Sequence, residues 1–267
     1  MGITIGRWQE KLIERLAERG IQTVLYSSGA FLLLKIPGFD QLVLNLIPVV
    51  NEFHAEELIG LQQEYRQNGI QLIQLWEDIW LNRPEQVLSR IYGLLGKNKK
   101  IHGRKTVISA VTQIEANQFF DLYHLQGSAK SRNRYALAVD QQIVAMATFS
   151  AKRKMTRKRE GYTSVELIRF ATADGLTVQG GLSKLIKHLI RTVFPDDVMT
   201  YADLDWSYGK GYAKLGFELK EQTPPLDICL DTQHLIRYFP HRLPEDTPAA
   251  NYIRIFNTGN LKYILYL

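Results

Sequence analysis

The sequence has almost no cysteine and no apolar run long enough to cross a membrane. Its single cysteine, Cys229, excludes a disulfide within the chain and a metal cluster held by several cysteines. No stretch of about 20 apolar residues is present, and the N-terminus lacks the design of a signal peptide. These absences predict a cytoplasmic protein that does not associate with a membrane.

The composition is that of a folded protein with room for two domains. Apolar residues make up 45% and charged residues 22% of the 267 residues, which is typical of globular proteins. That length suits two modest domains, each with its own core. A short polar and basic segment at 96–103 predicts the boundary. We therefore expect two α/β domains, at 1-96 and 97-267.

Apolar periodicity predicts the elements of the first domain. Trp8, Leu12 and Leu16 recur at helical spacing, and three apolar runs separated by turn residues are typical of strands. The expected order is helix 7–19, strands 21–26, 31–36 and 42–47, helix 55–66, strand 70–75 and helix 84–95.

The second domain is predicted to contain antiparallel strands before a strand–helix–strand unit. A tight turn at Asp140 and Gln141 joins two of the strands. The expected elements are strand 105–110, helix 114–123, strands 135–139, 142–149 and 165–171, a helix from 181 to 194, strand 198–202 and a short helix that Gly216 ends.

Two adjacent glycines, Gly180 and Gly181, precede the amphipathic helix of this unit. Free backbone N–H groups and the helix dipole make such a helix start favourable for an anion. A glycine pair can also serve only to let a strand turn tightly into a helix. Both interpretations stand at this stage.

Net charge is +6, and the basic residues are clustered. Clustered cations suit a polyanion, because each phosphate contact releases counterions. The other interpretation is two solvated, lysine-rich loops. We expect DNA contact from Lys99, Lys100, Arg104, Lys105, Lys152, Arg153, Lys154, Arg157 and Lys158.

The segment Tyr212-Ala-Lys-Leu-Gly-Phe217 after the glycine turn resembles the GNAT (Gcn5-related) acyltransferases. The resemblance implies that the tyrosine is the general acid for the leaving thiolate and that the glycine turn binds the pyrophosphate of acetyl-CoA or another acyl-CoA. Val178 stands where the family usually has Arg or Gln. The implied cofactor-binding residues are Gly180, Gly181, Leu182, Ser183 and Lys184.

Several motifs are similar to the Mom family, phage Mu-type enzymes that modify adenine in DNA and have a GNAT-like fold. They are His124-Leu-Gln-Gly127, Glu166-Leu-Ile-Arg169-Phe170 and Tyr201-Ala-Asp203. The resemblance implies a catalytic site of His124, Arg169, Asp203 and Tyr212.

Each of these residues also has a plain structural interpretation. His124 can cap the preceding helix, and Arg169 can pair with Glu166. Asp203 can cap the segment that follows its strand, and Tyr212 can pack beside Phe217.

The first domain resembles the Vsr and homing-endonuclease type of restriction-like nuclease, on the residues Ile70 to Trp80 and Leu94 to Lys97. Such enzymes hold a divalent metal with carboxylates. The resemblance places those acids at Leu33 and Asn45, neither of which binds a metal. Substitute ligands would be Asp40, Glu52, Glu56 and Glu57 around His54. We expect a degenerate, inactive nuclease domain and no metal.

The sequence thus predicts a GNAT-type acyltransferase that modifies a DNA base or another DNA-associated amine. Asp203 or His124 would accept the amine proton, and Tyr212 would assist the leaving thiolate. The alternatives are a DNA-binding protein without catalysis and a metal-dependent nuclease that uses the substitute acids.

Overall fold

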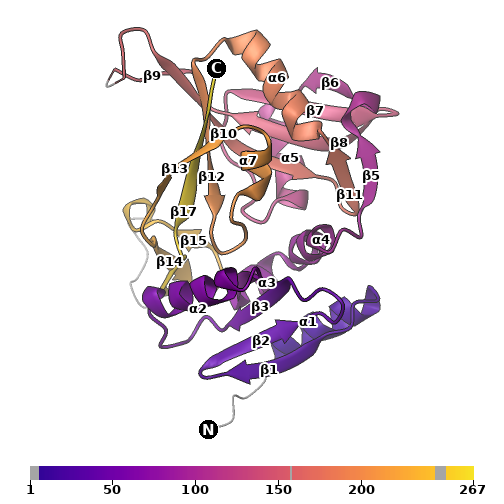
Figure 1. Ribbon diagram of the computed structural model, residues 1–267, viewed down its shortest axis with the longest axis vertical. Helices are drawn as coiled ribbons and strands as arrows, with labels where there is room; N and C mark the ends of the chain where they lie inside the picture. The colour runs from indigo at the N-terminus through magenta and orange to yellow at the C-terminus, as the bar shows by residue number, and fades with distance from the viewer. Residues whose placement is uncertain (1–5, 157, 244–250) are drawn as a thin grey trace. The chain divides into compact units, whose positions relative to one another are not determined.

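The computed structural model describes residues 6–156, 158–243 and 251–267 (Figure 1). The chain forms two compact units. Unit 1 comprises Met1–Pro84, Ala202–Tyr208 and Gln222–Leu261, and unit 2 comprises Glu85–Tyr201, Gly209–Glu221 and Lys262–Leu267. These units do not coincide with the two contiguous segments expected from the sequence, because two late segments pack with the first part of the chain.

Unit 1 is built on a four-stranded mixed sheet in the order β1-β2-β3-β4. β1 to β3 are antiparallel neighbours, whereas β3 and β4 are parallel and are joined through α2. Every residue of β3 is buried, which explains its continuous apolar sequence. The bounds are α1 Arg7–Glu18, β1 Val24–Ser28, β2 Phe31–Lys35, β3 Leu42–Ile47, α2 Ala55–Gln67 and β4 Gln71–Trp76.

A second, three-stranded sheet of unit 1 comes from the end of the chain, in the order β15-β14-β16. Its apolar residues Ile228, Leu230 and Ile255 form one buried cluster with Ile47, Leu58 and Trp76. This shared core explains why residues 222–261 belong to unit 1. The bounds are β14 Asp227–Asp231, β15 Arg237–Tyr238, η2 Pro240–Arg242 and β16 Tyr252–Phe256.

Unit 1 also contains a two-turn helix that the sequence pattern did not reveal. Helix α3 spans Glu77–Asn82 and follows β4 directly. Its Asp78 is buried and accepts two hydrogen bonds from Arg237, at 2.6 and 2.8 Å. A bidentate contact of this kind is specific in geometry and binds the second sheet to the first part of the chain.

The main sheet of unit 2 has the strand order β13-β17-β12-β10-β8-β7-β6, with β9 beside β10. The predicted α/β class and the predicted elements of this part are confirmed. Ala202 and Asp203 at the end of β12 belong to unit 1. The bounds are α4 Pro84–Leu94, β6 Val107–Ala110, α5 Gln113–Tyr123, β7 Asn133–Val139, β8 Gln142–Phe149, β9 Arg153–Lys154, β10 Thr163–Thr172, α6 Gly181–Val193, β12 Asp197–Asp203, α7 Lys210–Lys214, β13 Glu218–Gln222 and β17 Asn260–Tyr266.

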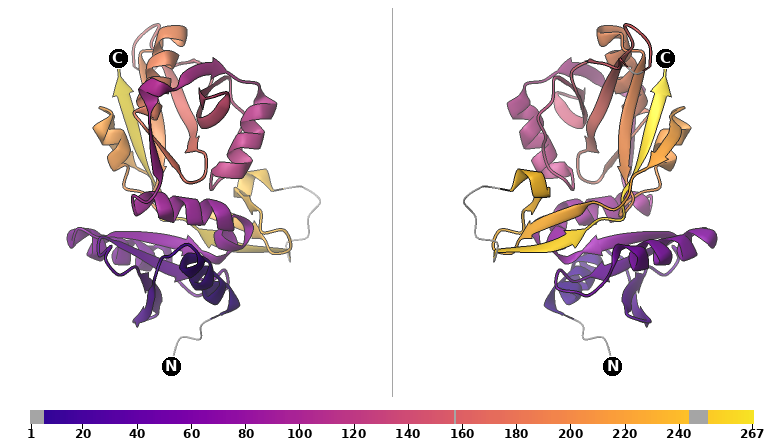
Figure 2. Two further views of the ribbon diagram at one scale, coloured as in Figure 1. Left: turned by 90° about the vertical axis from the view of Figure 1, so that its right-hand side faces the viewer. Right: turned by 90° about the vertical axis from the view of Figure 1, so that its left-hand side faces the viewer.

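Helices α5 and α6 cover opposite faces of this sheet (Figure 2). Ala136 of β7 packs in the cluster of α5, whereas its neighbour Tyr135 contacts His188 of α6. Adjacent strand residues point to opposite faces. The tight turn between β7 and β8 is confirmed, because Asp140 and Gln141 both have positive φ.

The segment predicted as a linker contains a strand. β5, Lys99–His102, pairs in parallel with β11, Leu176–Gln179, so that His102 lies opposite Gln179. The polar composition of 96–103 suggested a loop, but an edge strand tolerates lysine well. The pairing brings the basic segment beside the glycine turn, and η1, Gly103–Lys105, follows it.

Candidate functional site

Strands β10 and β12 run parallel but are paired over only three residues of each. Ser164 to Glu166 lie opposite Asp197 to Met199, and the Oγ1 of Thr200 then donates to the oxygen of Leu167 at 3.1 Å. Beyond that contact both strands continue without a ladder between them. β10 also has a bulge between Leu167 and Arg169 where it pairs with β8. The sheet therefore opens at the carboxyl end of these strands, which is where open α/β sheets bind ligands.

The glycine turn begins α6 in unit 2. Gly180 is the N-cap in the left-handed conformation, with φ 72° and ψ 4°, so its tight-turn role is confirmed. Within the described residues no side chain caps this helix and its first turn has no acidic residue. The first helical hydrogen bond runs from the N–H of Lys184 to the oxygen of Gly180. The N–H groups of residues 181–183 thus provide the donors that an anion needs.

Two glycines around this turn are required by packing. A Cβ atom on Gly181 would lie 2.9 Å from Cγ1 of Val178 and 3.2 Å from Cδ1 of Leu137. A Cβ atom on Gly103 would lie 3.0 Å from the oxygen of Gln179. Close approach of the protein to itself explains both glycines, without any requirement from a cofactor.

Lys184 was expected to bind the cofactor through its backbone N–H, but that N–H donates to the oxygen of Gly180. Its ammonium group is occupied within unit 2. Its Nζ donates to the oxygen of Gly103 at 3.0 Å, to the Oγ1 of Thr106 at 3.3 Å and to the oxygen of Thr106. An ammonium group has three donors, and these contacts account for all of them. Lys184 therefore holds the turn after β5 against the start of α6.

His124 is the C-cap residue of α5, so the capping interpretation is confirmed. Its Nδ1 accepts a hydrogen bond from the N–H of Gln126 at 3.1 Å. A neutral imidazole in that arrangement carries its proton on Nε2. In this form Nε2 of His124 is a hydrogen-bond donor, and the side chain would have to lose the Gln126 contact to accept a proton at Nδ1.

Arg169 contacts the loop that follows His124. Its Nε donates to the oxygen of Gly127 at 3.2 Å, and its Nη1 donates to the oxygen of Ile168 at 2.9 Å. Glu166, the alternative partner considered for Arg169, lies 3.8 Å from Arg153. The motif at 124–127 and the bulge of β10 are thus neighbours, and Arg169 joins them.

Tyr212 of α7 belongs to an aromatic cluster of unit 2. Its ring centroid lies 5.6 Å from that of Phe217 and 5.7 Å from that of Tyr263. Gly209 precedes α7 with φ 68°, and a Cβ atom there would lie 2.3 Å from Tyr263. The predicted packing beside Phe217 is confirmed, and the half-buried ring is held in a fixed position.

Asp203 belongs to unit 1, apart from the other three predicted catalytic residues. Its Oδ1 accepts from the N–H of Asp205 at 3.1 Å. Asp205 is buried and accepts from the N–H and the Oγ1 of Thr258, at 2.9 and 2.7 Å. Burial, and then repulsion from Asp203, raise the pKa of Asp205 to about 7. The sequence interpretation missed Asp205, although a second acid two residues beyond a strand-ending acid was a visible signal.

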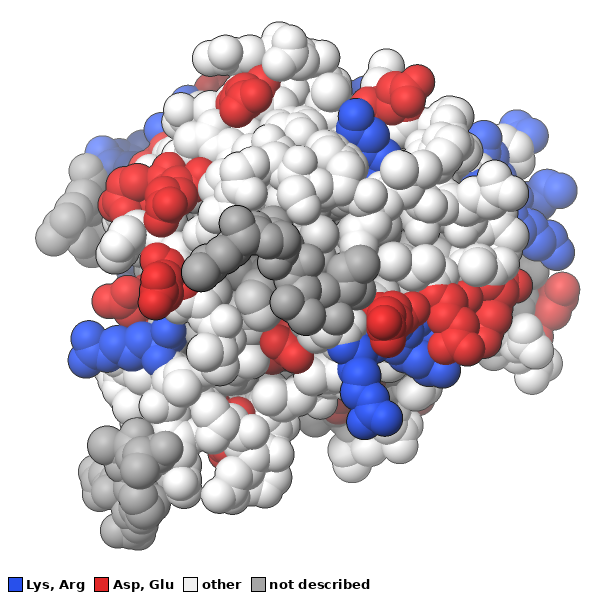
Figure 3. All heavy atoms as spheres, turned by 90° about the horizontal axis from the view of Figure 1, so that it is seen from below, with Lys and Arg blue, Asp and Glu red and all other residues white. Residues whose placement is uncertain are grey.

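The two basic clusters differ in how many of their side chains have partners within the protein. Lys99, Lys100, Arg104 and Lys105 are exposed on and after β5. In the other cluster, Lys152 donates to the oxygens of Val193 and Phe194, and Lys158 donates to Asp197 at 2.8 Å. On the face in Figure 3, Lys and Arg are interspersed with Asp and Glu.

The remaining hairpin residues are also partly engaged. Arg153 is paired with Glu166, whereas Lys154 is exposed on β9. Arg157 lies outside the described residues. The first cluster therefore presents more cations to an external polyanion than the second.

The positions where a nuclease would have its acids lie directly opposite each other in unit 1. Leu33 of β2 pairs with Asn45 of β3, and their exposed fractions are 0% and 1%. Asn45 donates to Gln74 at 2.8 Å. The substitute acid Glu57 accepts from the N–H of His54 at the start of α2, as a first-turn acid does. Within residues 6–156, 158–243 and 251–267, no three His, Cys, Asp or Glu side chains are grouped to hold a metal.

None of the helices that the structure describes is both long and apolar enough to span a membrane.

Comparison with solved structures finds similarity to GNAT acetyltransferases over 61% of the chain. A Bacillus subtilis acetyltransferase in complex with CoA is 17% identical, matched over 99% of its length, with a TM-score of 0.35. A GNAT family acetyltransferase from Elizabethkingia anophelis with acetyl-CoA bound is 16% identical, also matched over 99%, with a TM-score of 0.35. Ard1 from Thermoplasma volcanium is 13% identical, matched over 98%, with a TM-score of 0.38.

No protein-family model matches the chain, and no curated protein matches it. At the identities and TM-scores of the solved structures, the similarity transfers no residue role to this chain. The nuclease-like character of the first part and the likeness to Mom stay predictions.

Proposed function

We propose that the chain is an acyl-CoA-dependent transferase of the GNAT type, acting on a DNA base or another DNA-associated amine. The observation that carries the proposal is the opening between β10 and β12 in the unit that also contains the uncapped start of α6. An opened ladder leaves main-chain groups of β10 available, and an uncapped helix start offers donors to an anion. An acyl-CoA has both an amide-containing arm and a pyrophosphate.

The residues of unit 2 fit such a cofactor in their chemistry. The N–H groups of Gly181, Leu182 and Ser183 would hold the pyrophosphate, and the main chain of β10 beyond its bulge would hold the arm. No acid in the first turn of α6 opposes the bound charge. When bound, the cofactor supplies an activated thioester, and the protein has to bind and orient it.

Proton transfer in this proposal uses donors that unit 2 contains. Tyr212 is the donor to the departing thiolate, because its ring is fixed by Phe217 and Tyr263. His124, with its hydrogen on Nε2, would donate a hydrogen bond and not a proton, and Arg169 holds the loop that follows it. Asp203, the proton acceptor expected from the sequence, belongs to unit 1, and its part in the reaction stays a prediction.

The proposed acceptor is DNA because of the exposed cations on β5 and on η1, which follows it. Lys99, Lys100, Arg104 and Lys105 are exposed, and β5 pairs with the strand that leads into the glycine turn. A polyanion bound there would lie near the proposed cofactor site. Modification of a base, as in the Mom family, is the specific form of this proposal.

Cofactor binding is tested by a matched pair of variants on α6. Ser183→Glu places a negative charge among the N–H groups of the first turn, where it repels a pyrophosphate but agrees with the helix dipole. Lys187→Gln changes the net charge equally on an exposed position one turn later. We expect acetyl-CoA to raise the melting temperature of wild type and Lys187→Gln, but not of Ser183→Glu.

The outcome decides between the proposed functions. Absence of any shift for wild type at millimolar acetyl-CoA would contradict the acyl-CoA proposal and favour a DNA-binding protein without catalysis.

The acceptor is tested separately, by mass spectrometry of nucleosides from DNA co-expressed with wild type or with Tyr212→Phe. An acyl-modified nucleoside that requires Tyr212 supports DNA as the acceptor.

A further inference from the structure

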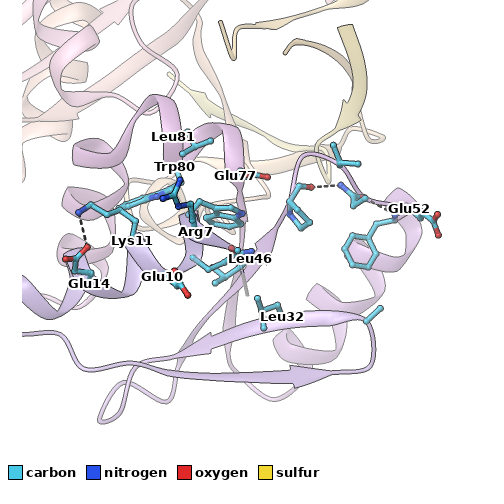
Figure 4. Close-up of a pocket in the computed structure, with 18 of the residues that line it drawn as sticks. Arg7, Glu10, Lys11, Glu14, Leu32, Leu46, Glu52, Glu77, Trp80 and Leu81 are labelled. Carbon is cyan, nitrogen blue, oxygen red and sulfur yellow. Dashed lines mark hydrogen bonds and ion pairs between the residues drawn. The ribbon is translucent and has the colours of Figure 1, made fainter. Parts of the chain in front are cut away.

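Unit 1 has a groove of about 1320 Å³ that the proposed transferase chemistry does not use (Figure 4). It is lined by α1, α3, the start of α2, parts of β2 and β3, and the loop at 48–53. Its volume exceeds the ~300–1,000 Å³ typical of small-molecule sites. The groove therefore suits an extended segment better than a compact ligand.

The rim of the groove is acidic. Five glutamates line it, against two cations, although the chain as a whole carries a net charge of +6. Figure 4 shows Glu10 and Glu14 at the α1 end and Glu52 at the opposite end, with Glu77 between them. Lys11 is paired with Glu14 at 2.9 Å, which leaves four glutamates of the lining against Arg7. The lining thus carries a net negative charge that attracts cations.

Two apolar side chains of the lining are exposed. Val50 is 81% exposed and Leu81 is 49% exposed, which is unusual for apolar groups that line a concave surface. Trp8 and Trp80, which also line the groove, are buried. An exposed apolar centre with a charged rim is typical of a protein–protein contact.

One buried polar atom of the lining has no partner. Gln9 is 4% exposed, and its Oε1 accepts no hydrogen bond from any residue within the part of the chain described. Leaving a buried carbonyl oxygen without a donor is costly. A donor in the groove reaches this atom only if the side chain turns, because the atom itself is enclosed.

We propose that this groove binds a cationic peptide segment that presents lysine or arginine side chains to the glutamates and an apolar side chain to Val50 and Leu81. Lysine and arginine side chains supply only donors and a positive charge, which match the carboxylates of the lining. The glutamates repel phosphates, so the groove complements a protein ligand and not DNA. The site goes beyond the transferase function and does not depend on it.

The test measures binding of two fluorescein-labelled peptides to the full chain by fluorescence anisotropy. One peptide alternates lysine with leucine, and the other replaces each lysine with glutamate. We expect saturable binding of the cationic peptide alone, weakened by salt.

A matched pair of double variants locates the contact. Glu10→Gln with Glu52→Gln removes two charges from the groove, and we expect roughly tenfold weaker binding. Glu18→Gln with Glu56→Gln removes two charges from α1 and α2 outside the lining, and we expect a change below roughly twofold. Val50→Lys adds a repelling charge at an exposed position that does not affect folding, and it should also weaken binding.

Absence of saturable binding to wild type would overturn the proposal. Equal weakening in both double variants would also overturn it, because the attraction would then be general surface charge. Melting curves of each variant show whether it is folded before binding is compared.

Discussion

The ammonium group of Lys184 donates to the main-chain oxygen of Gly103 at 3.0 Å, joining the first turn of α6 to the turn after β5. The residues are 81 positions apart in the chain. The basic strand and the glycine turn are thus parts of one arrangement, in which Gly103 also approaches the oxygen of Gln179.

Lys184→Met should lower the free energy of unfolding by about 1–2 kcal/mol, because it removes the ammonium donor from the carbonyl oxygen of Thr106. The oxygen of Gly103 loses the same donor but still accepts from the N–H and the Oγ1 of Thr106. Urea denaturation measures the effect, with Lys187→Met on the exposed face of α6 as the control. A variant with wild-type stability that has lost acetyl-CoA binding would instead indicate a direct phosphate contact.

Asp205→Asn should change how stability depends on pH. Asp205 has a pKa raised from 3.8 to about 7 in the folded state. The folded protein therefore binds more protons than the unfolded chain between these values, and this residue's contribution to stability is lost as pH rises from about 4 to 7. The free energy of unfolding should fall by at most about 4 kcal/mol over this range because of Asp205, and the variant should lack that fall.

Thermal melts of wild type and Asp205→Asn between these pH values check this expectation, and their difference isolates Asp205 from other acids. Asparagine retains an oxygen that accepts from Thr258. If the melting temperatures of the two proteins depended on pH in the same way, Asp205 would be ionised over the whole range.

DNA binding should weaken steeply with salt, and mainly through the first basic cluster. Replacing Lys99, Lys100 and Arg104 by glutamine should flatten the dependence of the logarithm of the binding constant on the logarithm of salt concentration by about 3. The same change at Lys152, Arg153 and Lys154 should flatten it less, because Lys152 and Arg153 already have partners. Filter binding at several salt concentrations measures both slopes, and a larger effect at 152–154 would contradict the assignment.

The chain should not cleave DNA with Mg²⁺ or Mn²⁺. Leu33 and Asn45 are buried and uncharged, and the side-chain amide of Asn45 donates a hydrogen bond to Gln74. Incubation of plasmid DNA with purified protein and either metal checks this. Metal-dependent cutting that disappears in Asp40→Asn would show that substitute acids function.

The elements themselves could be predicted from local sequence. Helix α1, strands β2 and β3 and the turn at Asp140 and Gln141 follow from apolar periodicity and turn residues, which act over a few positions. The left-handed Gly180 before α6 follows for the same reason. That Leu33 and Asn45 cannot bind a metal also follows from the identity of their side chains alone.

The tertiary structure decided which of these elements share a core and how the candidate residues are used. Ile228 packs with Ile47 across 181 positions that no local pattern connects, and β5 is a strand only because β11 lies beside it. The partners of Lys184, Lys158 and Arg169 come from distant segments, so their predicted ligand contacts could not be judged from the sequence. The pKa of Asp205 likewise depends on burial and on a neighbouring charge, which exist only in the folded chain.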